Sequence, residues 1–304
     1  MNNKLINWLL FIALSFIWGS SFILIKVGLQ HLTPYQVASI RIISSGIVLL
    51  PVALTSFKKI PKDKIFIVFM SGVIGSLVPA YLFCLAEVGI DSALAGTLNA
   101  LTPIFVIIFG ALFFNAKTTS NKIWGITIAF TGSLLLFFSQ PNFSENSNLS
   151  YILFVVLATS LYGINVNMVH KHLSQVGSLN IAAVALSLSA IPALIVLFFT
   201  GYFKLNYLDK GILLSTGYAS LLGVFGTAIS TVLFYILLKR AGAVFASMVT
   251  YGIPVIAIGW GIIYGEDIGW KQLISMLVIL CGVWVANRKL QAKVETSLAK
   301  NVTG

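Results

Sequence analysis

Long runs of apolar residues, separated by short polar links, cover almost the whole chain. A helix needs about 20 apolar residues to cross a bilayer core of about 30 Å, and the breaks between the runs predict ten such spans. These spans lie at 5–29, 34–55, 64–87, 92–115, 121–139, 149–170, 178–201, 211–238, 243–264 and 269–287. Only 140–148 forms a longer polar connector. The pattern predicts an all-α integral membrane protein of ten transmembrane helices, without a separate soluble domain.

Composition supports this prediction. Of the 304 residues 58% are hydrophobic and only 9% are charged, whereas soluble domains carry about 25% charged residues. A soluble globule could not bury so much apolar surface. The first run, 5–29, is longer than the apolar core of a signal peptide, which has about 7–15 residues. We therefore expect it to remain as the first span.

The basic residues predict how the chain is oriented. With the amino terminus inside, the outer segments hold only Lys204, Lys210 and Lys271, and Lys26 and Arg41 fall within spans. The inner segments hold all the others: Lys4, Lys58, Lys59, Lys62, Lys64, Lys117, Lys122, Lys171, Lys239, Arg240, Arg288, Lys289, Lys293 and Lys300. This positive-inside bias predicts cytoplasmic termini. We expect the protein in a bacterial plasma (inner) membrane. It also accounts for the net charge of +11, so that membrane lipid, rather than nucleic acid, is the expected acidic partner.

The second half of the chain repeats the first. Residues match at an offset of 151, as in Gly72/Gly223, Pro103/Pro254 and Gly110/Gly261, and near the front of each half at 144, as in Trp18/Tyr162 and Gly19/Gly163. Each half holds five predicted spans, an odd number, so the second copy must enter the membrane from the opposite side. Such inverted repeats occur in many secondary transporters. We predict a first repeat at 1–140, a second, inverted repeat at 149–289, and a cytoplasmic tail at 290–304.

Several of these residues carry a family resemblance. They are Trp18-Gly19-Ser20-Ser21-Phe22 with Lys26, Pro34 with Arg41, the run 98–103, the run 246–254, and Gly265-Glu266. On them the chain resembles the ten-span EamA-type transporters of the drug/metabolite transporter superfamily over nearly its whole length. The resemblance implies two five-helix repeats around a central cavity, and export or exchange of small metabolites, often amino acids. The polar sixth span, with Asn165, Asn167 and His170, differs from the family pattern, and the resemblance does not name a substrate.

Polar and aromatic residues deep within the spans are the candidates for lining the cavity. Side chains three apart share one face of a helix, and aromatic rings facing an aqueous cavity can stack on planar or apolar substrates. Trp18 and Tyr162 lie too deep to be interface anchors. The predicted lining residues are Trp18, Ser21, Lys26, Tyr81, Asn99, Thr102, Tyr162, Asn165, Tyr235, Thr250 and Tyr251.

Two matched prolines, Pro103 and Pro254, lie in the middle of the fourth and ninth spans. A proline inside a helix removes one backbone hydrogen bond and frees the carbonyl one turn earlier, here that of Asn99 or Thr250. Irregular backbone within a membrane is tolerated where it lines a cavity. We therefore predict that both prolines act as helix hinges beside the substrate.

The charged residues within or near spans leave alternatives open. Lys26 either extends toward the outer surface or attracts an anionic group at the cavity mouth. For Arg41 a structural role, binding helix-end carbonyls or an acidic outer loop, is favoured over substrate contact. Glu87 is the only span-associated carboxylate, so proton antiport, uniport and exchange all remain open.

Other function classes lack their motifs. The chain has no Gly-x-x-x-x-Gly-Lys-Ser/Thr loop and no dinucleotide fingerprint, so we expect no cofactor. Cys84 and Cys281 lie in apolar runs and are expected to be buried hydrophobes rather than metal ligands. An enzyme acting on lipid would need a cluster of nucleophile, base or metal ligands that the scarce acids and histidines do not supply. The sequence favours a secondary transporter of small organic metabolites such as amino acids over an enzyme or a non-transporting scaffold or receptor. Substrate, direction and oligomeric state stay open, a monomer among the options.

The predicted topology can be tested with single cysteines. In a background with Cys84 and Cys281 replaced by alanine, Lys204→Cys should react with an impermeant maleimide added to intact cells. Lys58→Cys should react only after permeabilisation, because the two positions are predicted on opposite faces. Labelling of both from the same side would contradict the inverted repeat.

Overall fold

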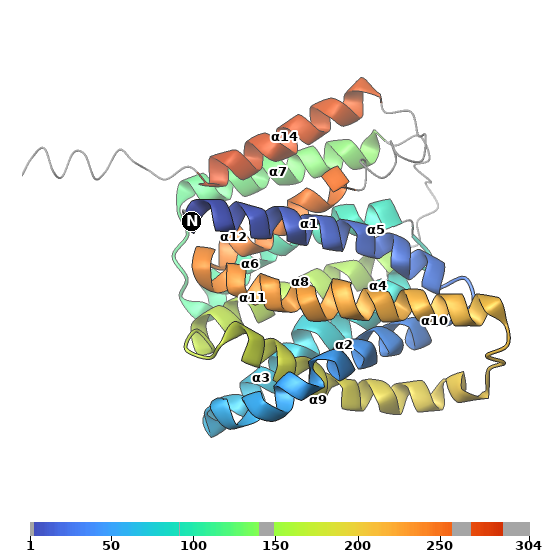
Figure 1. Ribbon diagram of the computed structural model, residues 1–304. Helices are drawn as coiled ribbons and strands as arrows, with labels where there is room; N and C mark the ends of the chain where they lie inside the picture. The colour runs from blue at the N-terminus through green and yellow to red at the C-terminus, as the bar shows by residue number, and fades with distance from the viewer. Residues whose placement is uncertain (1–2, 91, 140–148, 257–268, 288–304) are drawn as a thin grey trace, which may run out of the picture.

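The computed structural model describes residues 3–90, 92–139, 149–256 and 269–287, and within these ranges all regular elements are helical (Figure 1). The predicted connector 140–148, the end of the ninth span with Gly265 and Glu266, and the predicted tail 290–304 lie outside the described residues. The helices are α1 (Asn3–Gly28), α2 (Pro34–Ser56), α3 (Ile65–Gly72), α4 (Val78–Ala86), α5 (Ser92–Asn99), α6 (Thr102–Phe114), α7 (Ser120–Phe138), α8 (Leu149–His172), α9 (Ser178–Phe199), α10 (Lys210–Gly223), α11 (Ser230–Ala241), α12 (Ala243–Ser247) and α14 (Trp270–Asn287).

Many of these helices are long and apolar enough to span a membrane. In the described part of the chain seven stretches meet this requirement: Lys4–Gly28, Pro34–Lys59, Lys62–Ala86, Leu94–Phe114, Ser150–His172, Ser178–Phe199 and Lys210–Ala241. Ala243–Ile256 and Leu273–Ala286 are shorter apolar helices. The prediction of an all-α membrane fold is confirmed, whereas the count of ten spans remains a prediction.

The outer surface of the bundle is apolar. Phe66, Leu112 and Phe198 are each exposed by more than 60% of their surface (69%, 67% and 69%), and many other large apolar side chains are exposed with them. Soluble proteins rarely expose apolar surface so extensively. Polar side chains such as Asn99 and Asn165 are instead buried inside the bundle. This arrangement fits a protein whose surroundings are lipid.

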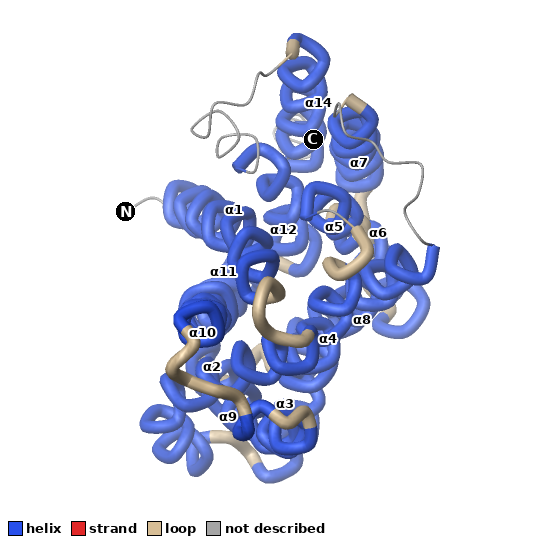
Figure 2. The backbone as a smooth tube through the Cα atoms, turned by 90° about the vertical axis from the view of Figure 1, so that its right-hand side faces the viewer, coloured by secondary structure: helices blue, strands red, loops and turns tan. Residues whose placement is uncertain are grey.

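Two helix pairs form the edges of the bundle. Helices α7 and α14 lie side by side at one edge, and α2 packs along α9 at the other, with α3 beside α9 (Figures 1 and 2). Helices α1, α4, α8 and α11 lie between these edges. Each edge pair joins one helix from each half of the chain, so the two halves are packed against each other rather than side by side as independent units.

Glycines at the edge pairs show that each half contacts the other in the same way. A Cβ on Gly132 of α7 would lie 2.7 Å from the backbone nitrogen of Ile279 in α14, and one on Gly282 of α14 would overlap that of Ala129 in α7. Both pairs are related by an offset of 150, so the contact is reciprocal. Small residues of this kind let membrane helices approach closely.

A second reciprocal contact joins the third and eighth spans to the opposite edge pair. A Cβ on Gly72 of α3 would overlap the carbonyl of Ala185 in α9, and one on Gly223 of α10 would overlap the carbonyl of Arg41 in α2. The glycines are 151 residues apart and their partners 144 apart, the two offsets of the sequence repeat. The tertiary contacts therefore follow the internal repeat.

The third and eighth spans are also interrupted at matching positions. A π-helical turn, Val73–Leu77, separates α3 from α4, and another, Val224–Ile229, separates α10 from α11. The turns begin 151 residues apart. π turns within helices are uncommon and often occur at functional sites.

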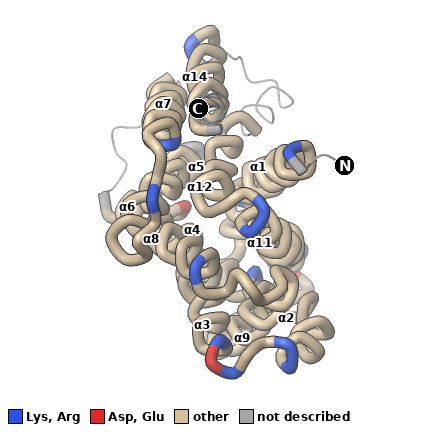
Figure 3. Tube along the Cα trace, turned by 90° about the vertical axis from the view of Figure 1, so that its left-hand side faces the viewer, with Lys and Arg blue, Asp and Glu red and all other residues tan. Residues whose placement is uncertain are grey.

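One end of the bundle is rich in basic residues. Figure 3 shows Lys and Arg segments gathered on the end that carries the start of α1. At this end Arg240 Nε of α11 donates a 3.0 Å hydrogen bond to Asn7 Oδ1 of α1, and Lys239 donates to the Val176 carbonyl. We call this end, where the end of α11 with Lys239 and Arg240 meets the start of α1, the basic end.

The reciprocal glycine contacts predict a specific sensitivity. Gly282→Ala should lower the apparent melting temperature in detergent by several degrees, because overpacking typically costs about 1–3 kcal/mol. Gly217→Ala on α10 is the matched control, since a Cβ there meets nothing within 4 Å. It should leave the melting temperature unchanged or raise it. Equal effects of both substitutions would show that the α7–α14 contact is not tight.

Candidate functional site

A cavity with an empty volume of about 880 Å³, its open mouth included, lies between the two halves. It is lined by residues from α1, α2, α4, α8 and α11 and by the interruptions of the helices. The lining residues are Trp18, Ser21, Phe22, Ile25, Arg41, Gly75, Ser76, Phe83, Asn99, Thr102, Tyr162, Asn165, Val166, Gly226, Thr227, Thr231, Phe234, Tyr235, Ser247 and Thr250. The lining combines apolar and aromatic side chains with a few polar groups, as small-molecule sites commonly do.

Most of the predicted cavity residues meet here. Trp18, Ser21, Asn99, Thr102, Tyr162, Asn165, Tyr235 and Thr250 all line the cavity.

Three predicted residues do not line it. Tyr251 is fully buried and its hydroxyl donates to the Ile126 carbonyl of α7 at 3.2 Å. The Tyr81 hydroxyl is hydrogen-bonded to Ser39 Oγ at 2.7 Å, and Lys26 is exposed on α1. A residue next to a lining residue in the sequence, as Tyr251 is to Thr250, can thus point toward a different helix.

Arg41, for which the sequence favoured a structural role, lines the cavity. Sequence analysis did not identify Gly75, Ser76 and Phe83 as lining residues. It also missed Gly226, Thr227 and Phe234, which lie 151 residues later at the repeat offset.

Much of the lining consists of repeat-related pairs. Each pair has one member in each half, at one of the two offsets found in the sequence. The pairs are Trp18/Tyr162, Ser21/Asn165, Phe22/Val166, Gly75/Gly226, Ser76/Thr227, Phe83/Phe234 and Asn99/Thr250. The cavity is therefore built by equivalent positions of the two halves.

Both prolines follow an interruption of a helix. Helix α5 ends at Asn99, and the amides of Ala100 and Leu101 donate to carbonyls three residues earlier, each at 3.0 Å, before α6 begins with Thr102-Pro103. In the second half the 3₁₀ turn Met248–Gly252 precedes Pro254. Each proline occupies the first turn of the next helical segment, where its missing N–H costs nothing. The interruptions are present; whether they act as hinges remains a prediction.

Aromatic rings from both halves frame the cavity. Trp18 Nε1 donates to the Gly226 carbonyl at 3.2 Å, and the Trp18 ring lies 5.4 Å from that of Phe234. Phe83 stacks on Tyr162 with ring centroids 6.1 Å apart. Such rings offer apolar faces to a substrate and hold each other in place.

Polar groups of the lining are only partly paired with one another. Thr102 Oγ1 donates to Asn99 Oδ1 at 3.2 Å, and Thr250 Oγ1 donates to the Ser247 carbonyl at 3.0 Å. The described part of the chain offers no hydrogen-bond donor to the shielded Oδ1 of Asn165. A buried polar atom without a partner is costly.

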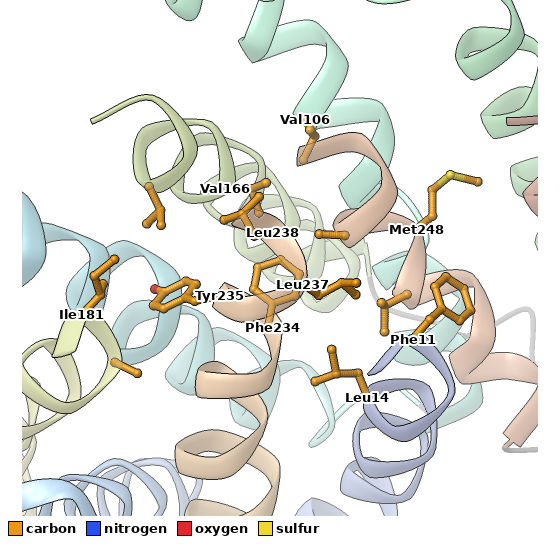
Figure 4. Packing of buried hydrophobic residues seen from close by; sticks show 14 of the residues in the cluster. Phe11, Leu14, Val106, Val166, Ile181, Phe234, Tyr235, Leu237, Leu238 and Met248 are labelled. Carbon is orange, nitrogen blue, oxygen red and sulfur yellow. The ribbon is translucent and has the colours of Figure 1, made fainter. Parts of the chain in front are cut away.

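Toward the basic end the cavity is closed by apolar side chains. Phe11 and Leu14 of α1 lie one to two turns before Trp18 and are packed with Leu237, Leu238 and Met248 (Figure 4). Leu14, Leu237 and Leu238 are fully buried. Within the described ranges no three His, Cys, Asp or Glu side chains gather closely enough to hold a metal ion.

Comparison with known proteins assigns the family. The model of the EamA-like transporter family matches residues 5–138 and again residues 149–288. The chain belongs to the EamA-like transporter family. The two matches follow the two halves of the internal repeat.

Relatives of this EamA protein are named as transporters. An "Uncharacterized transporter" of Archaeoglobus fulgidus is 27% identical over 284 residues, which cover 93% of this chain and 99% of the relative. The "Uncharacterized inner membrane transporter YedA" of Escherichia coli K12 is 26% identical over 290 residues, covering 90% and 86%. A "Probable amino-acid metabolite efflux pump" of the same organism is 28% identical over 145 residues, 47% of each chain.

A solved crystal structure shares the fold. It superposes with a TM-score of 0.70 at 16% identity and covers 97% of this chain and 98% of its own. Together with the apolar helices, the family match shows that this protein is a membrane transporter of the EamA family.

The cavity predicts which positions react with aqueous reagents. Thr231→Cys, in the lining, should react with a small polar methanethiosulfonate at least about tenfold faster than Ser45→Cys, because thiol modification requires exposure. Ser45 is the matched control: it lies on α2, is fully buried and donates to the Ile42 carbonyl. The two modification rates are measured by mass spectrometry in a background without other cysteines. Equal rates would contradict the assigned cavity.

Proposed function

We propose that this protein is a secondary transporter of small organic metabolites, amino acids among them, and works by alternating access between two inverted five-helix repeats. The observation that carries the proposal is the set of repeat-related pairs around one cavity. Two equivalent halves can close the cavity at one end or at the other with similar contacts, which gives two conformations of comparable energy.

The interrupted helices support this mechanism. Within a bilayer, irregular backbone is tolerated only where protein or water satisfies it. Both π turns and both proline-associated breaks contribute residues to the cavity: Gly75 and Ser76, Gly226 and Thr227, Asn99 and Thr102, and Ser247 and Thr250. We infer that Pro103 and Pro254 mark the hinges about which the wall segments move.

The apolar cluster at the basic end supports a directional assignment. Lys and Arg mark the cytoplasmic face of membrane proteins, so we infer that the basic end is cytoplasmic and that the cluster around Leu14 closes the inner side. The cavity lining on α1 starts at Trp18 and reaches Ile25, toward the opposite end. This conformation is then closed to the cytoplasm. We further propose cytoplasmic termini and, by analogy with the relative named an inner membrane transporter, a plasma membrane location.

A non-transporting scaffold or receptor is the alternative function. A scaffold would have no need of a polar, aromatic-framed cavity in the middle of the bundle, and a receptor would use it to bind a solute without moving it across the membrane. No residues described here are assigned catalytic roles, and transport needs no covalent step.

Transport can be tested by counterflow. Purified protein in proteoliposomes should accumulate at least one labelled solute of an amino-acid and metabolite panel above empty liposomes, because trapped unlabelled solute drives exchange through one site. Folding is checked by size-exclusion chromatography. Folded protein that exchanges no compound of the panel would favour the scaffold or receptor.

The site can be tested by substitution. Asn99→Ala should reduce counterflow about fivefold or more, since one hydrogen bond contributes about 1 kcal/mol, and Trp18→Ala should reduce it further by removing a ring of the frame. Trp124→Ala on α7 is the matched control, because Trp124 is 65% exposed on the outer surface. It should leave the rate unchanged. Unaltered kinetics for Asn99→Ala and Trp18→Ala together would refute the placement of the site.

A further inference from the structure

Arg41 is the charged side chain of the cavity lining. It lies on α2, is half-buried, and its Nε donates a 2.7 Å hydrogen bond to Thr227 Oγ1. A guanidinium carries five N–H donors, and Thr227 accepts from only one. Among the described residues Arg41 makes no ion pair; the ion pair found there joins Lys64 to Asp63. The terminal Nη groups therefore keep their donors.

An unpaired cation inside a membrane protein is costly. Such residues usually pair with another group or face a water-filled path, and they often mark the route of a substrate. The cost is lower in a cavity that an anionic ligand occupies, because the ligand supplies both countercharge and acceptors. The position of Arg41 in the lining thus has a physical explanation if the ligand is acidic.

The neighbouring charges do not replace such a ligand. Glu87, just after α4, feels the charges of Arg41 and Lys26, but it makes no ion pair with either. Its Oε2 accepts a 2.8 Å hydrogen bond from Ser92 Oγ, and it does not line the cavity. Lys26 adds a further positive charge nearby. The described cavity wall therefore contains a cation and no carboxylate.

Thr227 fixes where the guanidinium points. It belongs to the π turn Val224–Ile229, and its hydroxyl also donates to the Leu222 carbonyl at 3.4 Å. Arg41 lies on α2 of the first half, and Thr227 of the second half thus holds its Nε. With Nε held, the two Nη groups form the free edge of a planar fork that fits a carboxylate or phosphonate.

The cation breaks the equivalence of the two halves. At an offset of 144 the counterpart of Arg41 is Ala185, and at 151 the counterpart of Thr227 is Ser76. The aromatic pairs Trp18/Tyr162 and Phe83/Phe234, by contrast, occur in both halves. A ligand therefore meets one charged end, an aromatic frame and uncharged polar groups such as those of Asn99 and Thr250.

We infer that Arg41 binds the acidic group of the transported substrate, an oxyanion on a small organic molecule. This inference rests on the proposed transport function and names its substrate class. It replaces the structural role favoured from sequence: the bond to Thr227 positions Arg41, and the remaining donors bind the ligand.

A matched pair of probes tests the charge requirement without transport. Binding to purified protein in detergent is measured by thermal stabilisation and calorimetry, with 3-phenylpropionate and its neutral amide, 3-phenylpropanamide, which have nearly the same shape. The acid should bind at least about tenfold more tightly, since hydrogen bonds to charged groups are the stronger ones. The inference is overturned if no acid probe binds more tightly than the amide, or if no probe binds. A third probe, 2-phenylethylphosphonate, shows which oxyanion is preferred, and tighter binding of either acid than of the amide supports it.

Substitutions then assign the preference to a residue. Arg41→Gln should reduce the preference for acid over amide to near unity, and Arg41→Lys should keep a reduced preference because the charge remains without the fork. Lys204→Gln, on an exposed turn, controls for net charge and should bind as the unmodified protein does. If Arg41→Gln does not fold, Arg41→Lys still decides, because an unchanged affinity for the acid would overturn the inference. Loss of the preference in Lys26→Gln with its retention in Arg41→Gln would also overturn it.

These binding measurements separate the two proposals. A protein that prefers the acid but fails in counterflow retains the assigned site and loses the transport function. A protein that transports neutral or cationic compounds as readily as acids retains the transport function and loses the role of Arg41.

Discussion

The need to satisfy backbone hydrogen bonds in lipid shapes this structure. A bilayer core offers no water to an open N–H or C=O group, so a spanning segment must be helical wherever it meets lipid. The chain departs from regular α-helix within four of its apolar segments: at the two π turns, before Pro103, and before Pro254. All four departures contribute residues to one cavity. Because segments that meet lipid must be helical, the irregular backbone and its polar groups are found together at the candidate site.

Close packing of the two halves makes that cavity possible. Gly132 and Gly282 bring α7 and α14 together, and Gly72 and Gly223 bring the interrupted spans onto α9 and α2. These contacts occur in reciprocal pairs, so the edges of the bundle are tight while the middle is formed by larger, matched side chains. A binding site on the boundary between equivalent halves is the arrangement that alternating access requires.

Against this near-equivalence, Arg41 with Thr227 is an exception, because Ala185 and Ser76 occupy the corresponding positions. The aromatic frame is shared by both halves, whereas the charge is not. In the proposed mechanism the equivalent halves would permit the movement, and the departure from equivalence at Arg41 would serve recognition of the solute.

Sequence alone determined the helical membrane fold, the internal repeat and much of the cavity lining. Apolar runs and charge bias act locally, and the repeat offset pairs Trp18 with Tyr162 and Asn99 with Thr250 without any knowledge of packing. The same offset relates Phe83 to Phe234, which sequence analysis did not assign to the site. The tertiary structure decided the facing of individual side chains. Tyr251 turns to the Ile126 carbonyl although Thr250 beside it lines the cavity. Arg41 reaches the cavity because a π turn more than 180 residues away places Thr227 beside it. A π turn shifts every following side chain around the helix axis, and no pattern of apolar and polar residues records that shift.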